Sequence, residues 1–125
     1  MTATAAQIAR LRRMVSEPDD SNGYESYVLA EAIERFPLYD ADGYEQGDDD
    51  WVATYDLAAA ASDIWTEKAA ARSERMDFGA DGSTFSQSQQ YAQALKMARY
   101  YAARRSPGSV RVFVESGPVV EEQEV

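Results

Sequence analysis

The chain has 125 residues, of which 45% are apolar and 11% aromatic, and it carries a formal net charge of −10 at pH 7. This length and hydrophobicity indicate one folded domain and exclude a chain that is disordered throughout. Cysteine and histidine are both absent, which excludes disulfides, thiol catalysis and Cys-type zinc sites and removes the commonest general base and metal ligand.

The amino-terminal segment is basic and has a helical pattern. Residues 1–16 hold three Arg and no acid, with no apolar run long enough for a secretory leader or a membrane span. We therefore expect a protein that is made in a cytoplasm without a leader. Thr4 and Gln7 have the spacing of a capping box. The pattern predicts a helix from about Ala5 to Val15, whose apolar face consists of Ala5, Ile8, Leu11 and Val15.

Acidic residues are concentrated in the next part of the chain, where residues 17–50 hold twelve acids and one Arg. The large net acidity argues against nonspecific nucleic-acid binding, because that affinity comes from cations that neutralise phosphates. A second helix is expected after Asn22, a favourable N-cap residue, and Pro37 ends it near Phe36. Its apolar stripe consists of Tyr24, Tyr27, Val28, Ala32, Ile33 and Phe36.

A polar loop is expected over residues 38–50. It contains two glycines and is too long for a tight turn, and loops of this length inside compact domains are often functional. Two interpretations of Asp48, Asp49 and Asp50 stay open. They form either a solvated segment that aids solubility or a surface that repels DNA moving past it.

The third expected helix runs from about Trp51 to Met76 and is capped by one of the three preceding aspartates. One face of this helix consists of Trp51, Tyr55, Ala58, Trp65 and Ala69. The four alanines at 58–61 combine high helix propensity with little bulk. Another helix is therefore able to approach closely.

Residues 77–85 are expected to form a hairpin-like turn between two short extended pieces, because Asp81-Gly82 is a strong turn signal. Asp77 and Asp81 resemble a calcium site only superficially, since the spaced oxygen ligands of an EF-hand loop are missing. A fourth helix is expected from Ser86 to about Arg105. Its apolar stripe consists of Tyr91, Ala94, Leu95, Ala98, Tyr101 and Ala102.

The tail, residues 107–125, is expected to be extended and separate from a helical domain at 1–106. A period-two strand pattern is formed by Val110, Arg111, Val112, Phe113 and Val114. One strand is not stable alone, so this segment must pair with this chain or another. The last residues are expected to be flexible unless a partner binds them.

The predicted fold class is mainly α: a four-helix bundle-like single domain with a short hairpin-like turn and an extended C-terminal tail. Few residues of the chain are candidates for a catalytic role. The acid pairs Asp56/Asp63 and Glu31/Glu34 are of a kind that is more often exposed than catalytic. We therefore predict no catalytic, metal or cofactor site and no enzyme activity, with a carboxylate-based enzyme as a minor alternative.

Five stretches of the chain carry a family resemblance. They are 4–14 with Ser16-Glu17-Pro18, 32–38 with Asp40 and Gly43, 51–57 leading into 60–69, 77–82 with Phe85, Ser86, Ser88, Gln89 and Tyr91, and 98–101 with Arg104-Arg105. Together they span residues 4–106. In these stretches the chain resembles the head–tail connector proteins, also called adaptor or head-completion proteins, of long-tailed phages.

The resemblance implies a non-enzymatic virion subunit that is made in the host bacterial cytoplasm. Such subunits form a ring, typically twelvefold, between the portal and the tail or neck, and they extend the channel for genomic DNA. The DNA passes through without specific binding. The implied partners are the portal protein, further copies of the same chain and a head-closure or tail component. Neither a cofactor nor a membrane is implied.

Three sets of residues become interface candidates under this interpretation. The tail strand at Val110, Arg111, Val112, Phe113 and Val114 would bind the portal or a neighbouring subunit. The core and the ring contacts would share four aromatic anchors, Trp51, Trp65, Tyr91 and Tyr101. The channel or one ring face would carry Asp48, Asp49 and Asp50. The alternative is a cytosolic helical protein-interaction module that forms a small dimer and has no virion role.

Overall fold

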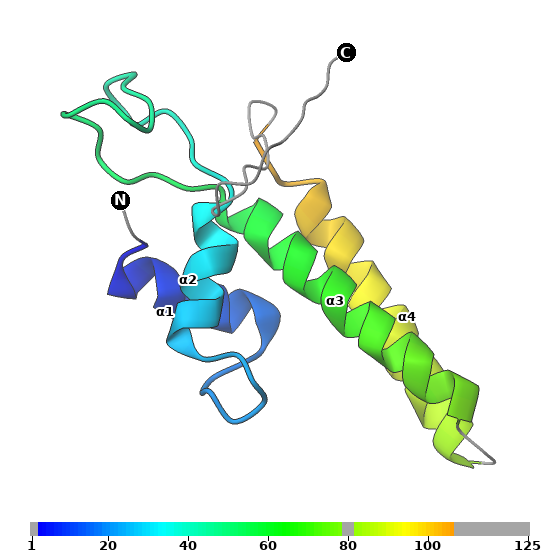
Figure 1. The fold of residues 1–125 in the computed structure, drawn as a ribbon. Helices are drawn as coiled ribbons and strands as arrows, with labels where there is room; N and C mark the ends of the chain where they lie inside the picture. The colour runs from blue at the N-terminus through cyan, green and yellow to red at the C-terminus, as the bar shows by residue number, and fades with distance from the viewer. Residues whose placement is uncertain (1–2, 79–81, 107–125) are drawn as a thin grey trace, which may run out of the picture.

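The computed structural model describes residues 3–78 and 82–106. Four helices make up this part of the chain: α1 (Ala5–Val15), α2 (Ser26–Glu34), α3 (Leu57–Phe78) and α4 (Gly82–Ala102) (Figure 1). Among the described residues there is no strand, and one antiparallel bridge joins Pro37 to Tyr55. The mainly helical, bundle-like fold predicted from the sequence is confirmed.

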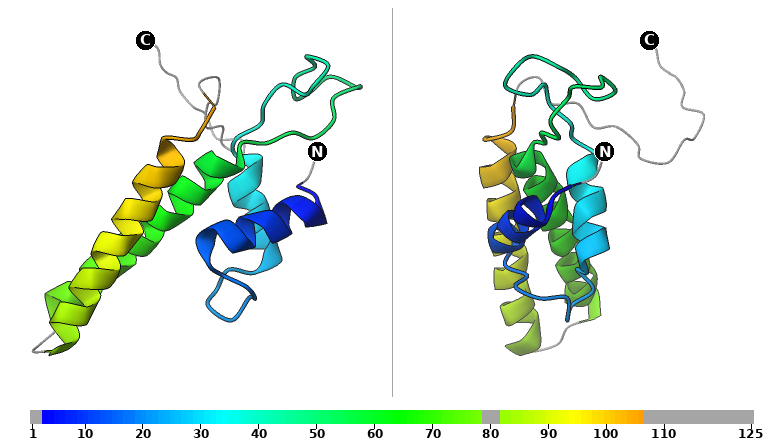
Figure 2. Two further views of the ribbon diagram at one scale, coloured as in Figure 1. Left: turned by 180° about the vertical axis from the view of Figure 1, so that it is seen from behind. Right: turned by 90° about the vertical axis from the view of Figure 1, so that its left-hand side faces the viewer.

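The helices form two parts of unequal length. Antiparallel helices α3 and α4 make a long helical hairpin, and the shorter α1 and α2 pack against the half of it that contains the start of α3 (Figures 1 and 2). The other half of the hairpin projects beyond them. Both hairpin helices bury alanines, which leave little bulk between backbones, and the Ser62 hydroxyl donates to the Ala98 carbonyl at 3.0 Å.

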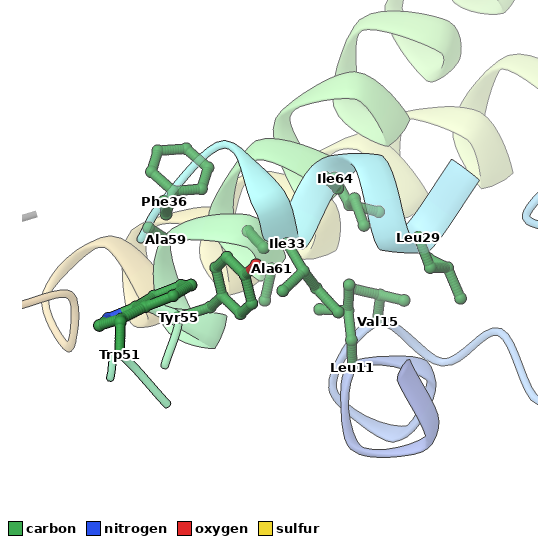
Figure 3. Close-up of a cluster of buried hydrophobic side chains, with 12 residues drawn as sticks. Leu11, Val15, Leu29, Ile33, Phe36, Trp51, Tyr55, Ala59, Ala61 and Ile64 are labelled. Atoms are coloured by element: carbon green, nitrogen blue, oxygen red, sulfur yellow. The ribbon is translucent and has the colours of Figure 1, made fainter. Parts of the chain in front are cut away.

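One hydrophobic core joins α1, α2, the start of α3 and the segment that precedes it (Figure 3). Its largest fully buried side chains are Leu11, Val15, Leu29, Ile33 and Phe36. Burying a side chain of this size contributes about 1.5–3 kcal/mol by removing apolar surface from water. The core therefore holds the base of the helical hairpin, and the projecting half lies outside it.

The first helix has the predicted bounds, Ala5–Val15, because its signals are local. The Thr4 hydroxyl accepts from the Gln7 amide at 3.1 Å, and the Gln7 side chain accepts from the Thr4 amide at 2.8 Å. This reciprocal capping box satisfies two amides that the helix itself leaves unpaired.

The predicted start of the third helix at Trp51 is wrong, because α3 begins at Leu57. Residues 51–56 are non-helical, and the Leu38 amide donates to the Thr54 carbonyl while the Asp56 amide donates to the Phe36 carbonyl, both at 2.8 Å. The expected cap, one of Asp48, Asp49 and Asp50, is also wrong, because the cap is Asp56, whose Oδ1 accepts from the Ala59 amide at 3.1 Å. Pairing with the segment after α2 therefore competes successfully with helix formation before residue 57.

Two other expectations differ in detail. The second helix begins at Ser26, later than predicted, because the preceding residues belong to a loop that is fixed from α1. The extended pieces expected within 77–85 are wrong at 77–78 and 82–85, which are helical, so the connection joins two helices.

The predicted tail strand, residues 110–114, lies outside the described residues. None of the described helices is both long and apolar enough to cross a membrane.

Candidate protein-interaction surfaces

The longest connection in the described part of the chain, residues 35–56, is closed at its base by the two backbone hydrogen bonds described above. Its interior is tied to that base by Trp51, whose indole Nε1 donates to the Leu38 carbonyl at 2.9 Å. The Trp51 ring is buried and meets the Tyr55 ring edge-on, with centroids 5.6 Å apart. The loop is therefore fixed to the hydrophobic core at its neck (Figure 3).

Asp40 organises the rest of this loop. Its Oδ1 accepts from the amides of Asp42 and Tyr44, and its Oδ2 accepts from the amide of Val52, all at 2.9 Å. These hydrogen bonds, above all the one from Val52, hold the pKa of the Asp40 carboxyl below its ordinary value. One carboxylate thus joins the segment that enters the loop to the segment that leaves it.

The loop nevertheless presents large apolar side chains to water. Tyr39, Tyr44 and Val52 are 68%, 40% and 65% exposed, and all of residues 41–50 are exposed, including Asp48, Asp49 and Asp50. The Asp48 carboxylate accepts from the Glu45 amide at 3.0 Å, so one member of this acidic triplet shapes a turn. Three large exposed side chains on one loop, with acidic residues between them in the sequence, make this loop a candidate protein-interaction surface. We call residues 38–52 the apical loop.

A second connection, residues 16–25, is organised from outside by Arg12. Its Nη1 donates to the carbonyls of Glu17, Asp19 and Tyr24 at 3.1, 2.9 and 3.0 Å, and its Nη2 donates to the Ser26 hydroxyl at 3.3 Å. A guanidinium suits this role because it carries five donors in a rigid plane. The loop is thereby held against α1.

The same connection is joined to α3 by an ion pair between the buried Glu17 and the half-buried Lys68. Lys68 Nζ lies 2.5 Å from Glu17 Oε2 and donates to the Val15 carbonyl at 2.6 Å. The ammonium also lies 4.5 Å from the centroid of the Trp65 ring, and the Asn22 side chain donates to Glu17 Oε1 at 3.1 Å. Each charge has several partners, as buried charges require. This cluster fastens α1 and its following loop to the middle of α3.

The four predicted aromatic anchors fall in different environments. Trp51 is 4% exposed and belongs to the core. Trp65 and Tyr101 are half-buried and pack against that core, and the Trp65 indole donates to the Met14 carbonyl at 3.0 Å. Tyr91 is half-buried on α4 and lies outside the core cluster. The structure therefore does not bring the four anchors together into one surface.

One member of each acidic pair considered as a chemical candidate accepts hydrogen bonds from backbone amides and so stabilises the fold. The Asp56 carboxylate caps α3 and also accepts from the Ser106 amide at 2.7 Å, and Glu34 accepts from the Ala3 amide at 2.8 Å. Across the described ranges, no group of three or more carboxylates is placed to hold a metal ion. Of the suggested calcium pair, Asp81 lies outside these ranges.

Comparison with protein-family models, with curated proteins and with solved structures gave no significant match to this chain.

Proposed function

We propose that this chain is a structural connector subunit that forms a ring between the portal and the tail or neck of a phage virion. The proposal combines the sequence resemblance over residues 4–106 with one observation, the apical loop. This loop is ordered by Asp40 and anchored by Trp51, yet it exposes Tyr39 and Val52. A fixed segment with exposed apolar side chains supports a role in binding another protein.

The shape of the subunit is compatible with this role. The apical loop and the projecting end of the α3–α4 hairpin lie at opposite ends of the molecule (Figures 1 and 2). A subunit inserted between two larger assemblies needs one contact surface at each end and lateral surfaces for its neighbours. The acidic side chains of the apical loop also favour a position where DNA slides past without binding.

Mixing the purified full chain with portal rings tests the proposal directly. Mass measurement and electron microscopy are expected to show a ring of this protein stacked coaxially on the portal. A monomer or small dimer that does not bind the portal would contradict the proposal and favour a helical protein-interaction module.

Surface variants sharpen the same experiment. Tyr39→Ser combined with Val52→Ser is expected to weaken stacking on the portal or on the next component while leaving the melting temperature unchanged. The matched control is Tyr27→Ser, because Tyr27 is 64% exposed but lies on α2, away from the apical loop. Equal effects of the two variants would exclude the apical loop as the contact surface.

A further inference from the structure

A groove of about 650 Å³ runs between α1 and the end of α4, over the first turn of α3. Helix α1 contributes one wall, α4 contributes the other, and α3 with its preceding residues forms the floor. The lining residues are Arg10, Met14, Leu38, Tyr55, Asp56, Leu57, Ala58, Tyr100, Tyr101, Arg104 and Ser106.

The groove combines an apolar floor with cationic rims. Met14, Leu57 and Ala58 are half-buried, whereas Arg10 and Arg104 are exposed, one on each rim. The described part of the chain offers neither arginine an ion pair. The groove's one acid, Asp56, already accepts from two backbone amides. Its unmatched charge is therefore positive.

Arg104 is held in place on its rim. Its guanidinium carbon lies 3.6 Å from the centroid of the Tyr100 ring, and its Nη1 donates to the Tyr100 carbonyl at 3.0 Å. Such stacking restricts the side chain and leaves further N–H groups of the guanidinium for a ligand. A carboxylate that binds here therefore meets a pre-positioned donor, which reduces the entropy lost on binding.

The chain itself leaves the helical domain at this groove. Ser106 lines it, and its amide is bound by Asp56. Residues 107–125 follow, with four Glu and one Arg, and the last seven residues hold three valines, three Glu and no base. Nineteen residues reach about 60 Å when extended, enough to span to a neighbouring subunit. This composition of valines and carboxylates complements an apolar floor between two arginines.

We propose that the groove between α1 and α4 binds the C-terminal segment of a second copy of this chain. Val119 and Val120 pack on the floor near Ala58, and Glu121 and Glu122 pair with Arg10 and Arg104. The choice of a second copy rests on the proposed ring, because a segment passed from each subunit to the next is a heterologous contact, the kind that closes rings. The groove is thereby assigned as the lateral contact between neighbouring subunits of that ring.

Cysteine pairing tests this contact in the full chain, which has no cysteine of its own. One preparation carries Ala58→Cys and a size tag, and a second, untagged, carries Val120→Cys. After mixing and mild oxidation, a disulfide-linked heterodimer is expected, since a disulfide forms only when the Cβ atoms approach to about 4 Å. The matched control is Ala70→Cys, an exposed position on the same helix about 18 Å further along. It is expected to form little heterodimer.

Two results would overturn the proposal. One is a heterodimer yield no greater with Ala58→Cys than with Ala70→Cys. The other comes from a third preparation that carries both Ala58→Cys and Val120→Cys: a disulfide that forms only within one chain would show that the groove binds its own tail. The assay contains no portal, so its failure is distinguishable from failure of the proposed connector function, which is read from stacking on the portal.

Charge reversal tests the recognition itself. Arg10→Glu with Arg104→Glu is expected to lower the crosslinking rate about fivefold to tenfold, and Glu121→Arg with Glu122→Arg on the partner is expected to restore it. The control with the same net charge is Arg13→Glu with Lys96→Glu, two exposed positions on the same helices outside the groove lining. An equal decrease of the crosslinking rate in both double variants would show that net charge alone causes the effect. It would contradict the assigned pairs.

Discussion

Two loops in the described part of the chain, residues 16–25 and the apical loop, are ordered by opposite chemistry. In residues 16–25 a cation on α1, Arg12, donates to three loop carbonyls. In the apical loop an anion within the loop, Asp40, accepts from three loop amides. Both arrangements satisfy backbone groups that neither helix nor sheet would pair.

The position of the organising residue decides what each loop presents to solvent. Arg12 belongs to a helix, so it holds residues 16–25 against the domain, where Glu17 is buried, Tyr24 is half-buried and the exposed residues include no large apolar side chain. Asp40 belongs to its own loop, so the apical loop closes on itself and leaves Tyr39 and Val52 exposed. The first loop therefore stabilises the fold, whereas the second forms a surface.

The largest expected effect comes from removing the residue that links the apical loop to the core. Trp51→Ala is expected to lower the free energy of unfolding by about 3–5 kcal/mol, because it leaves a cavity in place of a buried aromatic ring. Urea denaturation measures this change. Trp51→Phe keeps an aromatic ring but loses part of the buried indole and the hydrogen bond to Leu38, so it is expected to cost less than Trp51→Ala, about 1–3 kcal/mol. A near-zero effect of Trp51→Ala would show that the loop is not coupled to the core.

Arg12→Ala is expected to rank second, with a loss of about 2–3 kcal/mol in the free energy of unfolding, since it removes charge-assisted hydrogen bonds to three loop carbonyls, two of them in part-buried bonds. The control is Arg13→Ala, an exposed neighbour on α1, for which a change within about 0.5 kcal/mol is expected. Thermal or urea unfolding checks both. Equal effects would mean that charge on α1 matters and the loop contacts do not.

Asp40→Ala is expected to act locally. Hydrogen exchange at the amides of Asp42, Tyr44 and Val52 should become faster, while exchange in α3 and α4 stays unchanged, because the loop opens without unfolding the domain. Asp42→Ala serves as the control, since the described hydrogen bonds of the turn use the Asp42 amide and not its carboxylate. Faster exchange throughout the helices would contradict the separation of the apical loop from the fold.

The smallest expected effect is the loss of hydrogen-exchange protection in the apical loop at acidic pH. Because the folded pKa of Asp40 lies below its ordinary value of 3.8, the carboxylate stabilises the loop above that value and ceases to do so as the pH falls through the lowered folded pKa. Exchange at the Val52 amide, corrected for its intrinsic pH dependence, is therefore expected to stay protected down to about pH 4 and to lose protection below it. In Asp40→Ala this transition should be missing. A loss of protection near neutral pH would point to another group.

Local signals in the sequence determined what could be predicted. The bounds of α1 follow from the capping box of Thr4 and Gln7, which needs only neighbours in the chain. The start of α3 could not be predicted in this way, since both Asp50 and Asp56 are suitable caps. The choice between them depends on Trp51, which is buried in the core and bonded to Leu38.

The candidate surfaces were predicted less completely than the helices. The exposure of Asp48, Asp49 and Asp50 follows from their charge, and the role of Trp51 as an anchor follows from its size and hydrophobicity. The roles of Arg12 and Asp40 do not, because their partners are backbone groups, which every residue type carries. The pairing of Glu17 with Lys68 joins residues far apart in the chain, and helical periodicity contains no information about such a contact.

The closed neck of the apical loop also makes its tip a tolerant place for inserted sequence. The pairing of Pro37 with Tyr55 fixes the loop ends. Residues added at the tip therefore change the free energy of folding only through the entropy of loop closure. Doubling the length of such a loop costs only about 0.6 kcal/mol. A short peptide epitope inserted at Gly47, which is exposed and adopts a φ of 105°, should therefore be displayed without disturbing the helices.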